Sequence, residues 1–276
     1  KAKGRLFHID SVSNAVINLD DEFASDLAAG LSGGVRVVGY SLKKETDVSL
    51  IEAAAKDFGV EFSVSVSGDI IKARLPLFGL FNVQNVLAVI ATLVSIGWRT
   101  SKIQASLENL SPVAGRMDVF RRAGQPTIVV DYAHTPDALE KALSAVRDHF
   151  PDQYISCVFG CGGDRDSSKR SVMGQIASRF SDRVVLTSDN PRSENPESII
   201  REIQAGVEGA DLYVNSDRAE AIREAIHLAS GNEIIVIAGK GHEDYQELAS
   251  GRVPFSDYAV IDEVMSAGTV TNDEEK

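Results

Sequence analysis

The chain has 276 residues, of which 43% are hydrophobic and 25% charged, a balance typical of folded globular proteins with one large domain or two smaller ones. Its formal net charge of −12 argues against a broad electrostatic surface for nucleic acid or anionic lipid, so an anionic ligand must be bound locally. The two cysteines, Cys157 and Cys161, are too few for a disulfide framework or a four-cysteine zinc site. We expect them to be small core residues of a cytoplasmic protein.

No segment has the features of a membrane span or a secretory signal. The longest apolar stretch, residues 83–98, is interrupted by polar residues and is shorter than the roughly 20 residues that a membrane helix needs, so it predicts a buried helix. The N-terminus has basic residues but no apolar segment after them. Because the sequence does not begin with Met, we expect that it starts within a longer protein or has been processed.

The first part of the chain contains short strands and helices. In chain order, the apolar patterns predict a strand at 15–18, a helix from Asp20, a strand at 35–40, a hairpin of strands 61–66 and 70–75, and helices at 81–98 and 103–110. The segment 67–69 supplies the turn of the hairpin. The pattern breaks at 112–115, which predicts a boundary between domains 1–114 and 115–276.

The second part alternates regularly between strand and helix. Strands are predicted at 127–131, 154–159, 183–187, 211–215 and 233–238, with helices at 136–150, 169–180, 196–207 and 217–229. Nearly continuous apolar strands predict an α/β domain with a parallel sheet covered on both faces. Pro136 and Pro196 stand where a proline suits the first turn of a helix. The polar tail, 266–276, is expected to fray.

The loops that follow the predicted strands contain the candidate ligand-binding residues. In an open α/β sheet, ligands bind beyond the carboxyl ends of the strands. Here those loops combine glycines, which let a ligand approach the backbone, with charges of both signs. The four loops are 131–134, 160–166, 188–192 and 239–243.

Four side chains in these loops favour a zwitterionic amino acid as the ligand. Arg165 and Arg192 each offer a planar fork for a carboxylate or phosphate, and Asp189 and Glu243 can receive an ammonium. A phosphate ligand alone would not need the acids, unless they hold Mg²⁺ through water. The alternatives are ion pairs within the loops, with Asp164, Asp166 or Asp189, and acids that cap the following helices.

Other residues favour a nucleotide nearby. Lys169 begins a helix after a glycine-rich loop, where it can meet a phosphate, although a surface lysine is the commoner outcome. His134 and His242 are plausible ligands for a nucleotide. The sequence contains no histidine pair with zinc-ligand spacing, no Gly-x-Ser-x-Gly motif and no Gly-x-x-x-x-Gly-Lys-Ser/Thr phosphate loop.

Six longer motifs lie in an order and spacing that cover almost the whole chain. They are FNVQN at 81–85, GRMDVF at 115–120, DYAHTPDALEKAL at 131–143, CVFGCGGDRD at 157–166, DNPR at 189–192 and AGKGHEDYQ at 238–246. With these motifs the chain resembles the Mur ligases, and among them the branch that adds meso-diaminopimelate to UDP-N-acetylmuramoyl-L-alanyl-D-glutamate in peptidoglycan synthesis. Ser171 departs from the pattern, which usually has proline there.

The resemblance implies a C-terminal Rossmann-like domain with a mostly parallel sheet, preceded by the latter part of the central ATPase domain. The phosphate-loop half of that domain and the UDP-binding domain would lie outside this sequence, so the chain alone would be inactive. Lys3 would be the carbamylated lysine that helps to bind Mg²⁺. The resemblance also implies catalytic roles for Lys169 and His134, and ATP contacts from Asn82, Asn85, Arg116, Asp131 and His134.

The resemblance in the DNPR motif indicates which amino acid is the substrate. By resemblance, Arg192 clamps the carboxylate that diaminopimelate has and lysine lacks. The rest of the amino acid would be held by Arg165, Asp189, Asn190, Pro191, Gly239 and Glu243. The implied reaction is ATP-dependent: the D-glutamyl carboxylate is activated and the amine of diaminopimelate attacks it.

Two alternatives remain at the level of sequence. Folylpolyglutamate ligases share the architecture but are expected to lack the DNPR motif. A chain without a phosphate loop is also compatible with a non-catalytic amino-acid-binding module or a structural partner. No partner beyond small-molecule substrates is predicted, neither nucleic acid nor membrane, and the sequence does not indicate an oligomeric state.

Overall fold

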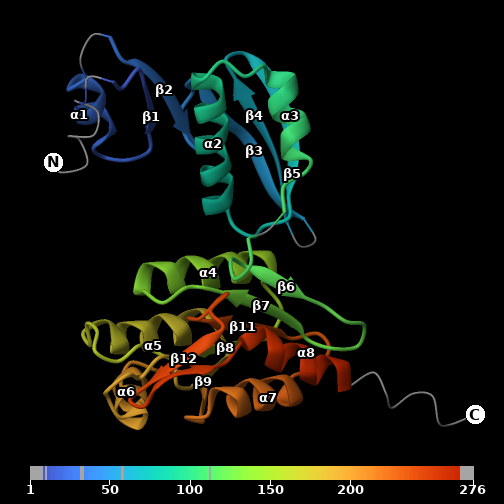
Figure 1. Ribbon diagram of the computed structural model, residues 1–276. Coiled ribbons are helices and arrows are strands. Elements are labelled where there is room, and N and C mark those ends of the chain that lie inside the picture. The colour runs from blue at the N-terminus through green and yellow to red at the C-terminus, as the bar shows by residue number, and fades with distance from the viewer. Residues whose placement is uncertain (1–8, 10, 32–33, 57–58, 112, 268–276) are drawn as a thin grey trace, which may run out of the picture. The chain divides into compact units, whose positions relative to one another are not determined.

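In the computed structural model the described residues are 9, 11–31, 34–56, 59–111 and 113–267, and the chain divides into two compact units, 1–111 and 112–276. Figure 1 labels their elements. The division falls three residues before the predicted boundary. No helix in the described ranges is long and apolar enough to cross a membrane.

The first unit contains a five-stranded sheet in the order β1-β2-β3-β4-β5. Its strands are β1 (Asn14–Asn18), β2 (Arg36–Ser41), β3 (Val48–Lys56), β4 (Gly59–Val66) and β5 (Asp69–Leu75). β1, β2 and β3 run parallel, and β3, β4 and β5 form an antiparallel meander. Ser67 and Gly68 both have positive φ, as a two-residue hairpin turn requires, which confirms the predicted hairpin. β3 was not predicted, because alanines and a glutamate replace the apolar alternation over most of its length.

Helices α2 (Leu80–Ser95) and α3 (Thr100–Leu107) pack against this sheet, while α1 (Ala24–Ala29) lies beside β1. The apolar side chains of α2 and α3 join those of the strands in one core that includes Phe62, Leu87 and Ile103, while Ala24 of α1 packs in a smaller cluster with Ala15 and Ile17 of β1. The helix predicted from Asp20 begins four residues later, at Ala24, because the Asp20 carboxylate accepts hydrogen bonds from Ser41 and Leu42 instead of joining the helix. α2 ends before the predicted residue 98, since Gly97 adopts a φ of 84°.

The second unit contains a six-stranded sheet in the order β10-β9-β8-β11-β7-β6. Its strands are β6 (Asp118–Phe120), β7 (Thr127–Asp131), β8 (Ile155–Phe159), β9 (Arg183–Leu186), β10 (Asp211–Val214) and β11 (Ile234–Ala238). All pairings are parallel except that of β6, which confirms the predicted Rossmann-like, mostly parallel sheet. β10 departs from the expected full burial, because it is an edge strand on which Val214 is 50% exposed.

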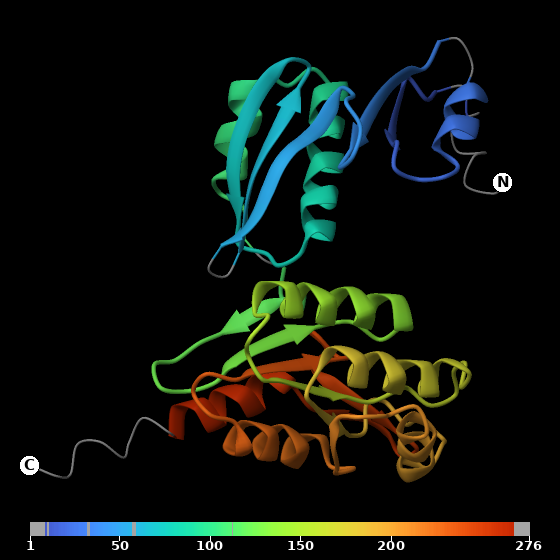
Figure 2. The ribbon, with the colours of Figure 1, turned by 180° about the vertical axis from the view of Figure 1, so that it is seen from behind.

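Helices cover this sheet in two layers, α4 (Pro136–His149), α5 (Lys169–Phe180) and α6 (Pro196–Gln204) in one, α7 (Arg218–Leu228) and α8 (Asp257–Ala267) in the other (Figure 2). As predicted, Pro136 and Pro196 stand in the first turn. α8 was not predicted, nor was the hairpin of β12 (Tyr245–Leu248) and β13 (Gly251–Pro254). Ser266 belongs to α8, and 268–276 lie outside the described residues.

The topology of the second unit brings the functional loops together. β7, β8, β9 and β11 run parallel, so the loops that leave their carboxyl ends meet at one edge of the sheet. These are the four loops that the sequence indicates as the ligand-binding edge.

Candidate functional site

A hollow of about 350 Å³ lies at this edge of the second unit. Its lining contains eight of the predicted site residues: His134, Arg165, Lys169, Asp189, Asn190, Arg192, Gly239 and Glu243. Tyr132, Thr135, Gly162 and Asp166 complete it. The structure therefore gathers residues from four loops, spread over more than a hundred positions of sequence, around one space.

Two of the loops are locked together through their backbones. The Gly163 N–H donates to the Asn190 carbonyl at 2.9 Å, and a Cβ on Gly163 would stand 2.0 Å from the Pro191 carbonyl oxygen. No side chain fits there, so glycine is required for the approach. A Cβ on Gly162 would lie 3.0 Å from Nη1 of Arg192 and 3.8 Å from Cγ of Arg165, which shows that both arginines flank one short stretch of backbone.

A buried arginine reinforces this junction from α5. Arg170, 1% exposed, donates to Glu194 at 2.9 Å and to Glu202 at 3.0 Å. Glu194 also accepts the N–H of Asp164, so it joins the glycine-rich loop to the segment after DNPR. The hydrogen bond from Arg170 lowers the pKa of Glu194. Asp164 accepts from Ser193, which lowers the pKa of Asp164 in turn.

Arg192 occupies the left-handed region with a φ of 53° and presents its guanidinium to the hollow. Its Nε donates to Glu247 at 2.9 Å and its Nη1 to the Gly163 carbonyl at 2.7 Å, while Nη2 has no partner among the described residues. The expected alternative, an ion pair with Asp164, Asp166 or Asp189, is wrong for Arg192, because Glu247 takes that place.

Arg165 lies on the other side of Gly162 with its side chain exposed. Within the described part of the chain it has no ion-pair partner. The two arginines thus offer the same hollow one guanidinium that is braced by the protein and one that is free to follow a ligand.

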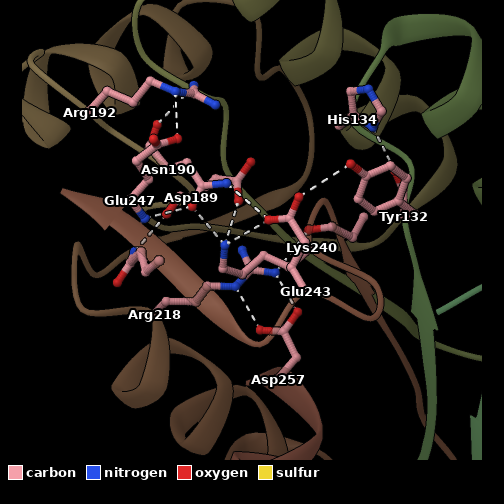
Figure 3. A network of polar contacts seen from close by, with 12 residues as sticks. Tyr132, His134, Asp189, Asn190, Arg192, Arg218, Lys240, Glu243, Glu247 and Asp257 are labelled. Carbon is pink, nitrogen blue, oxygen red and sulfur yellow. Dashed lines mark hydrogen bonds and ion pairs between the residues drawn. The ribbon is translucent and has the colours of Figure 1, made fainter. Parts of the chain in front are cut away.

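The acidic side of the hollow is built on Lys240, whose side chain is fully buried (Figure 3). Its ammonium donates to Asn190 Oδ1 at 2.9 Å, Glu243 Oε2 at 3.3 Å and Asp189 Oδ1 at 3.4 Å. Asn190 in turn donates to Glu243 at 3.0 Å. Burial raises the pKa of Glu243, but hydrogen bonds from Asn190 and Tyr132 and the charge of Lys240 outweigh it and leave that pKa below its usual value.

The alternative that these acids cap helices is wrong. The carboxylate of Asp189 faces Lys240, and Glu243 is followed by β12 rather than by a helix. The N-termini of α4, α6 and α7 are capped by other side chains, those of Thr135, Asn195 and Asp217.

Next to the acids, an exposed cluster of aromatic and basic residues surrounds Tyr132. The Tyr132 hydroxyl donates to Glu243 at 3.2 Å, and its ring meets the rings of His134 and His242. Lys169 Nζ donates to the His134 carbonyl at 2.7 Å, and the Arg116 guanidinium lies 5.0 Å from the centre of the Tyr132 ring.

Two predicted site residues support the loops without lining the hollow. Asp131 is 8% exposed, and its oxygens accept the N–H groups of Met117 at 2.9 Å and Ala133 at 2.8 Å. Burial raises the pKa of Asp131 despite these bonds. Pro191 is buried in its loop, where its carbonyl accepts from Glu194.

Asn82 and Asn85 lie in the first unit, in the first turns of α2. Asn82 donates to the Phe78 carbonyl at 2.7 Å, and Asn85 donates to Asn82 at 3.4 Å. Lys3 lies outside the described residues. Within the described ranges no group of three or more His, Cys, Asp or Glu residues is arranged to hold a metal ion.

Sequence reasoning missed Lys240, Glu247 and the fully buried ion pair of Arg218 with Asp257. Lys240 had a signal, since it lies two residues after the end of an apolar strand, in one of the four functional loops. Glu247 had none, because the β12–β13 hairpin that presents it was not predicted. In the sequence, Arg218 resembles an ordinary residue at the start of a helix. In the fold, its Nη2 donates to the Ala238 carbonyl at 3.1 Å.

Comparisons with known proteins match both parts of the chain to domains of one family. The family model "Mur ligase, glutamate ligase domain" matches residues 115–241, and "Mur ligase middle domain" matches 1–93. Two relatives are named UDP-N-acetylmuramoyl-L-alanyl-D-glutamate--2,6-diaminopimelate ligase. The protein of Chromobacterium violaceum is 43% identical over 97% of this chain and 54% of its own length. The protein of Alkalilimnicola ehrlichii is 44% identical over 95% of this chain and 53% of its own length.

A solved structure with the same name aligns with a TM-score of 0.68 and 37% identity, over 97% of this chain and 56% of that one. The chain therefore spans about half the length of the relatives it matches.

Proposed function

The chain belongs to the Mur ligase family, and from this premise we propose that it is the amino-acid-binding part of an ATP-dependent ligase that joins meso-diaminopimelate to UDP-N-acetylmuramoyl-L-alanyl-D-glutamate. Residues 115–276 would bind the amino acid and residues 1–114 would form the latter part of the ATP-binding domain. The names of the relatives at 43% and 44% identity support this assignment.

The observation that carries the proposal is the arrangement of two guanidinium groups and two carboxylates around one hollow. Arg192 and Arg165 suit carboxylates, while Asp189 and Glu243 suit an ammonium. An amino acid with a second zwitterionic centre fits this pattern because it presents both charges to the protein at the end that does not react.

The same arrangement would discriminate against lysine. Lysine has no second carboxylate, so its binding would leave the half-buried Arg192 without the anion that the hollow is built to receive. A desolvated, unpaired charged group costs free energy, which is why polar sites reject analogues that lack the matching group more strongly than apolar sites reject a missing methylene. Asn190, Pro191 and Gly239 would shape the rest of this subsite.

The nucleotide would lie beside the exposed cations around Tyr132. Arg116, His134 and Lys169 fit an anion chemically, since each is accessible or partly so and carries N–H donors. We assign Asp131 to holding their loop, and Asn82 and Asn85 to the ATP-binding unit. ATP, when bound, would supply the phosphoryl group that activates the carboxylate for attack by the amine.

In the reaction, the residues of this chain would act mainly by position. Asp189 and Glu243 would hold the far ammonium, Arg165 and Arg192 the carboxylates, and Lys169 and His134 would orient and neutralise the phosphate groups. The described residues do not fit a magnesium site by themselves, because no three side chains of His, Cys, Asp or Glu converge among them. Two free, buried cysteines agree with a cytoplasmic location for this chemistry.

The test is the kinetics of Arg192→Ala in the full-length ligase. Removing the guanidinium should raise the KM for meso-diaminopimelate by about 100-fold or more, because the second carboxylate loses its charge-assisted hydrogen bonds. The matched control is Arg201→Ala on the exposed side of α6, which should leave the KM unchanged. An unchanged KM in Arg192→Ala would contradict the proposal.

A further inference from the structure

Lys240 is a fully buried lysine in the centre of the candidate site, and nothing in the proposed function uses it. A buried ammonium needs an acceptor for each of its hydrogens and a nearby negative charge. Lys240 has both, since Asn190 Oδ1, Glu243 Oε2 and Asp189 Oδ1 lie within 3.4 Å and two of the three belong to carboxylates. The face of the Tyr245 ring lies 5.7 Å away on another side.

The oxygens that Lys240 binds are the inner ones. On Asp189 the bond goes to Oδ1, and Oδ2 has no partner among the described residues. That free oxygen would be 3.7 Å from a Cβ on Gly239, a residue that lines the hollow and has a φ of 114°. Glycine therefore leaves open the path between the hollow and the unoccupied Asp189 oxygen.

Glu243 is held in the same way from several sides. Its Oε2 receives Asn190 and Lys240, and its Oε1 receives the Tyr132 hydroxyl at 3.2 Å. Figure 3 shows the Lys240 ammonium between Asn190 and Glu243, with the Arg218–Asp257 pair on the side of Lys240 away from Tyr132. The two carboxylates and one ammonium leave a single negative charge at this end of the hollow, which is the complement of one ligand ammonium.

We propose that Lys240 is a positioning residue for amino-acid binding, whose ammonium fixes the inner oxygens of Asp189, Asn190 and Glu243 and thereby aims the free Asp189 oxygen at the ammonium of the ligand. This deepens the proposed function and rests on it. Lys240 itself does not touch the ligand, since it has no exposed surface.

If Lys240 has this role, its ammonium also helps to keep the Glu243 carboxylate ionised. The titratable and charged groups that face this pair come from α7, α8, β12 and the loops after β7, β9 and β11: Tyr132, Asp189, Arg218, His242, Tyr245 and Asp257. Of the cationic side chains in the described ranges, only Lys240 donates to Glu243 directly. Without it, burial and the charge of Asp189 act against the Glu243 carboxylate, so the pKa of Glu243 should rise.

The test compares Lys240→Met with Lys141→Met, since Lys141 is a surface lysine on α4 that pairs with Asp137. Calorimetry of the chain with meso-diaminopimelate should show binding roughly 100-fold weaker for Lys240→Met at about pH 6 and a smaller loss at about pH 8.5, because a Glu243 with a raised pKa is less ionised at the lower pH. The control should bind as the wild type does. A loss by the same factor at both pH values would indicate a merely structural role and overturn the inference, as would binding within about threefold of wild type.

A second readout separates this inference from the proposed function. Carbon NMR of the labelled Glu243 carboxyl group should show a raised pKa in Lys240→Met whether or not a ligand binds, and an unchanged pKa would overturn the role of Lys240. If the wild-type chain binds no meso-diaminopimelate, the proposed function fails, and the ligand named here fails with it.

A third variant covers the case in which Lys240→Met does not fold. Lys240→Arg keeps the charge but replaces three hydrogens on one atom with a planar fork that cannot reach the same three acceptors. It should keep the pKa of Glu243 low and still weaken binding by about tenfold. Wild-type affinity in a folded Lys240→Arg would contradict the positioning role.

Discussion

Individual side chains in the hollow are fixed by neighbours that come from other loops. Arg192 is oriented by Glu247 and by the Gly163 carbonyl, and Glu243 is held by Asn190, Lys240 and Tyr132. All of these bonds except the one from Lys240 to Glu243 join different segments, so a ligand meets groups that have already lost most of their freedom. Such preorganisation lowers the entropy that binding must overcome.

Both cysteines are buried, and their burial predicts that they react slowly. Burial raises the pKa of Cys157 and of Cys161 to about 12, so almost no thiolate exists near neutral pH. In the folded chain at about pH 8, iodoacetamide should modify them at least about 100-fold more slowly than in the denatured chain. Mass spectrometry over time checks this, and rapid modification of either native thiol would contradict the described burial.

Some residue roles could be predicted from the sequence and others could not. Eight predicted site residues line the hollow, because the strand-end rule for α/β sheets depends only on local strand patterns. Lys240 was missed as a functional residue because its importance comes from acids that lie 51 and 3 positions away in sequence, which meet only in the fold. The partner of Arg192 was predicted wrongly for the same reason.

At the scale of elements, the site depends on the contact between the glycine-rich loop and the DNPR loop. Gly163 lies against the Pro191 carbonyl with no room for a Cβ, and the Gly163 carbonyl accepts from Arg192. A shift of either loop would therefore move a guanidinium away from the hollow.

This contact predicts the effect of Gly163→Ala. The new Cβ would stand 2.0 Å from a backbone oxygen, so the two loops must separate, at a cost of about 2–4 kcal/mol in the free energy of unfolding. Binding of meso-diaminopimelate should weaken strongly as well. The matched control is Gly34→Ala, since a Cβ on Gly34 would meet nothing within 4 Å. Urea unfolding checks the stability, and equal stability of the two variants would contradict the described packing.

The elements themselves were predictable where apolar residues are continuous. β7, β8, β9 and β11 and the helices between them follow the predicted pattern, with α5 beginning and ending at the predicted residues. β3 and the β12–β13 hairpin were missed, because their half-exposed strands carry few apolar residues. Tertiary pairing, rather than local pattern, makes these segments strands.

At the scale of the whole molecule, the acids of the second unit predict how stability changes with pH. Burial raises the pKa of Asp182, but hydrogen bonds from the Ile155 N–H and from Arg147 outweigh it, so this pKa is lower in the folded chain than the ordinary 3.8. Ionised Asp182 therefore stabilises the fold at pH values above 3.8, and this contribution is lost as the pH falls through the folded value.

Asp182→Asn tests this linkage. At about pH 7 the substitution should lower the free energy of unfolding by about 1 kcal/mol, a modest value because the carboxylate is partly exposed to solvent. At about pH 3 the difference from the wild type should shrink, since Asp182 of the unfolded chain, with its ordinary pKa of 3.8, then mostly keeps a proton that folding tends to remove. Asp152→Asn, at an exposed position, is the control. A difference that is the same at both pH values would contradict the assigned role of the charge.

We propose that the second unit binds a doubly carboxylated amino acid in the hollow between Arg192 and Asp189. Isothermal titration calorimetry of the chain with meso-diaminopimelate and with L-lysine tests it most directly. We expect saturable binding of meso-diaminopimelate, at least about 100-fold tighter than that of lysine, with this preference lost in Arg192→Ala. Equal affinity for the two amino acids, or no binding of either, would contradict it.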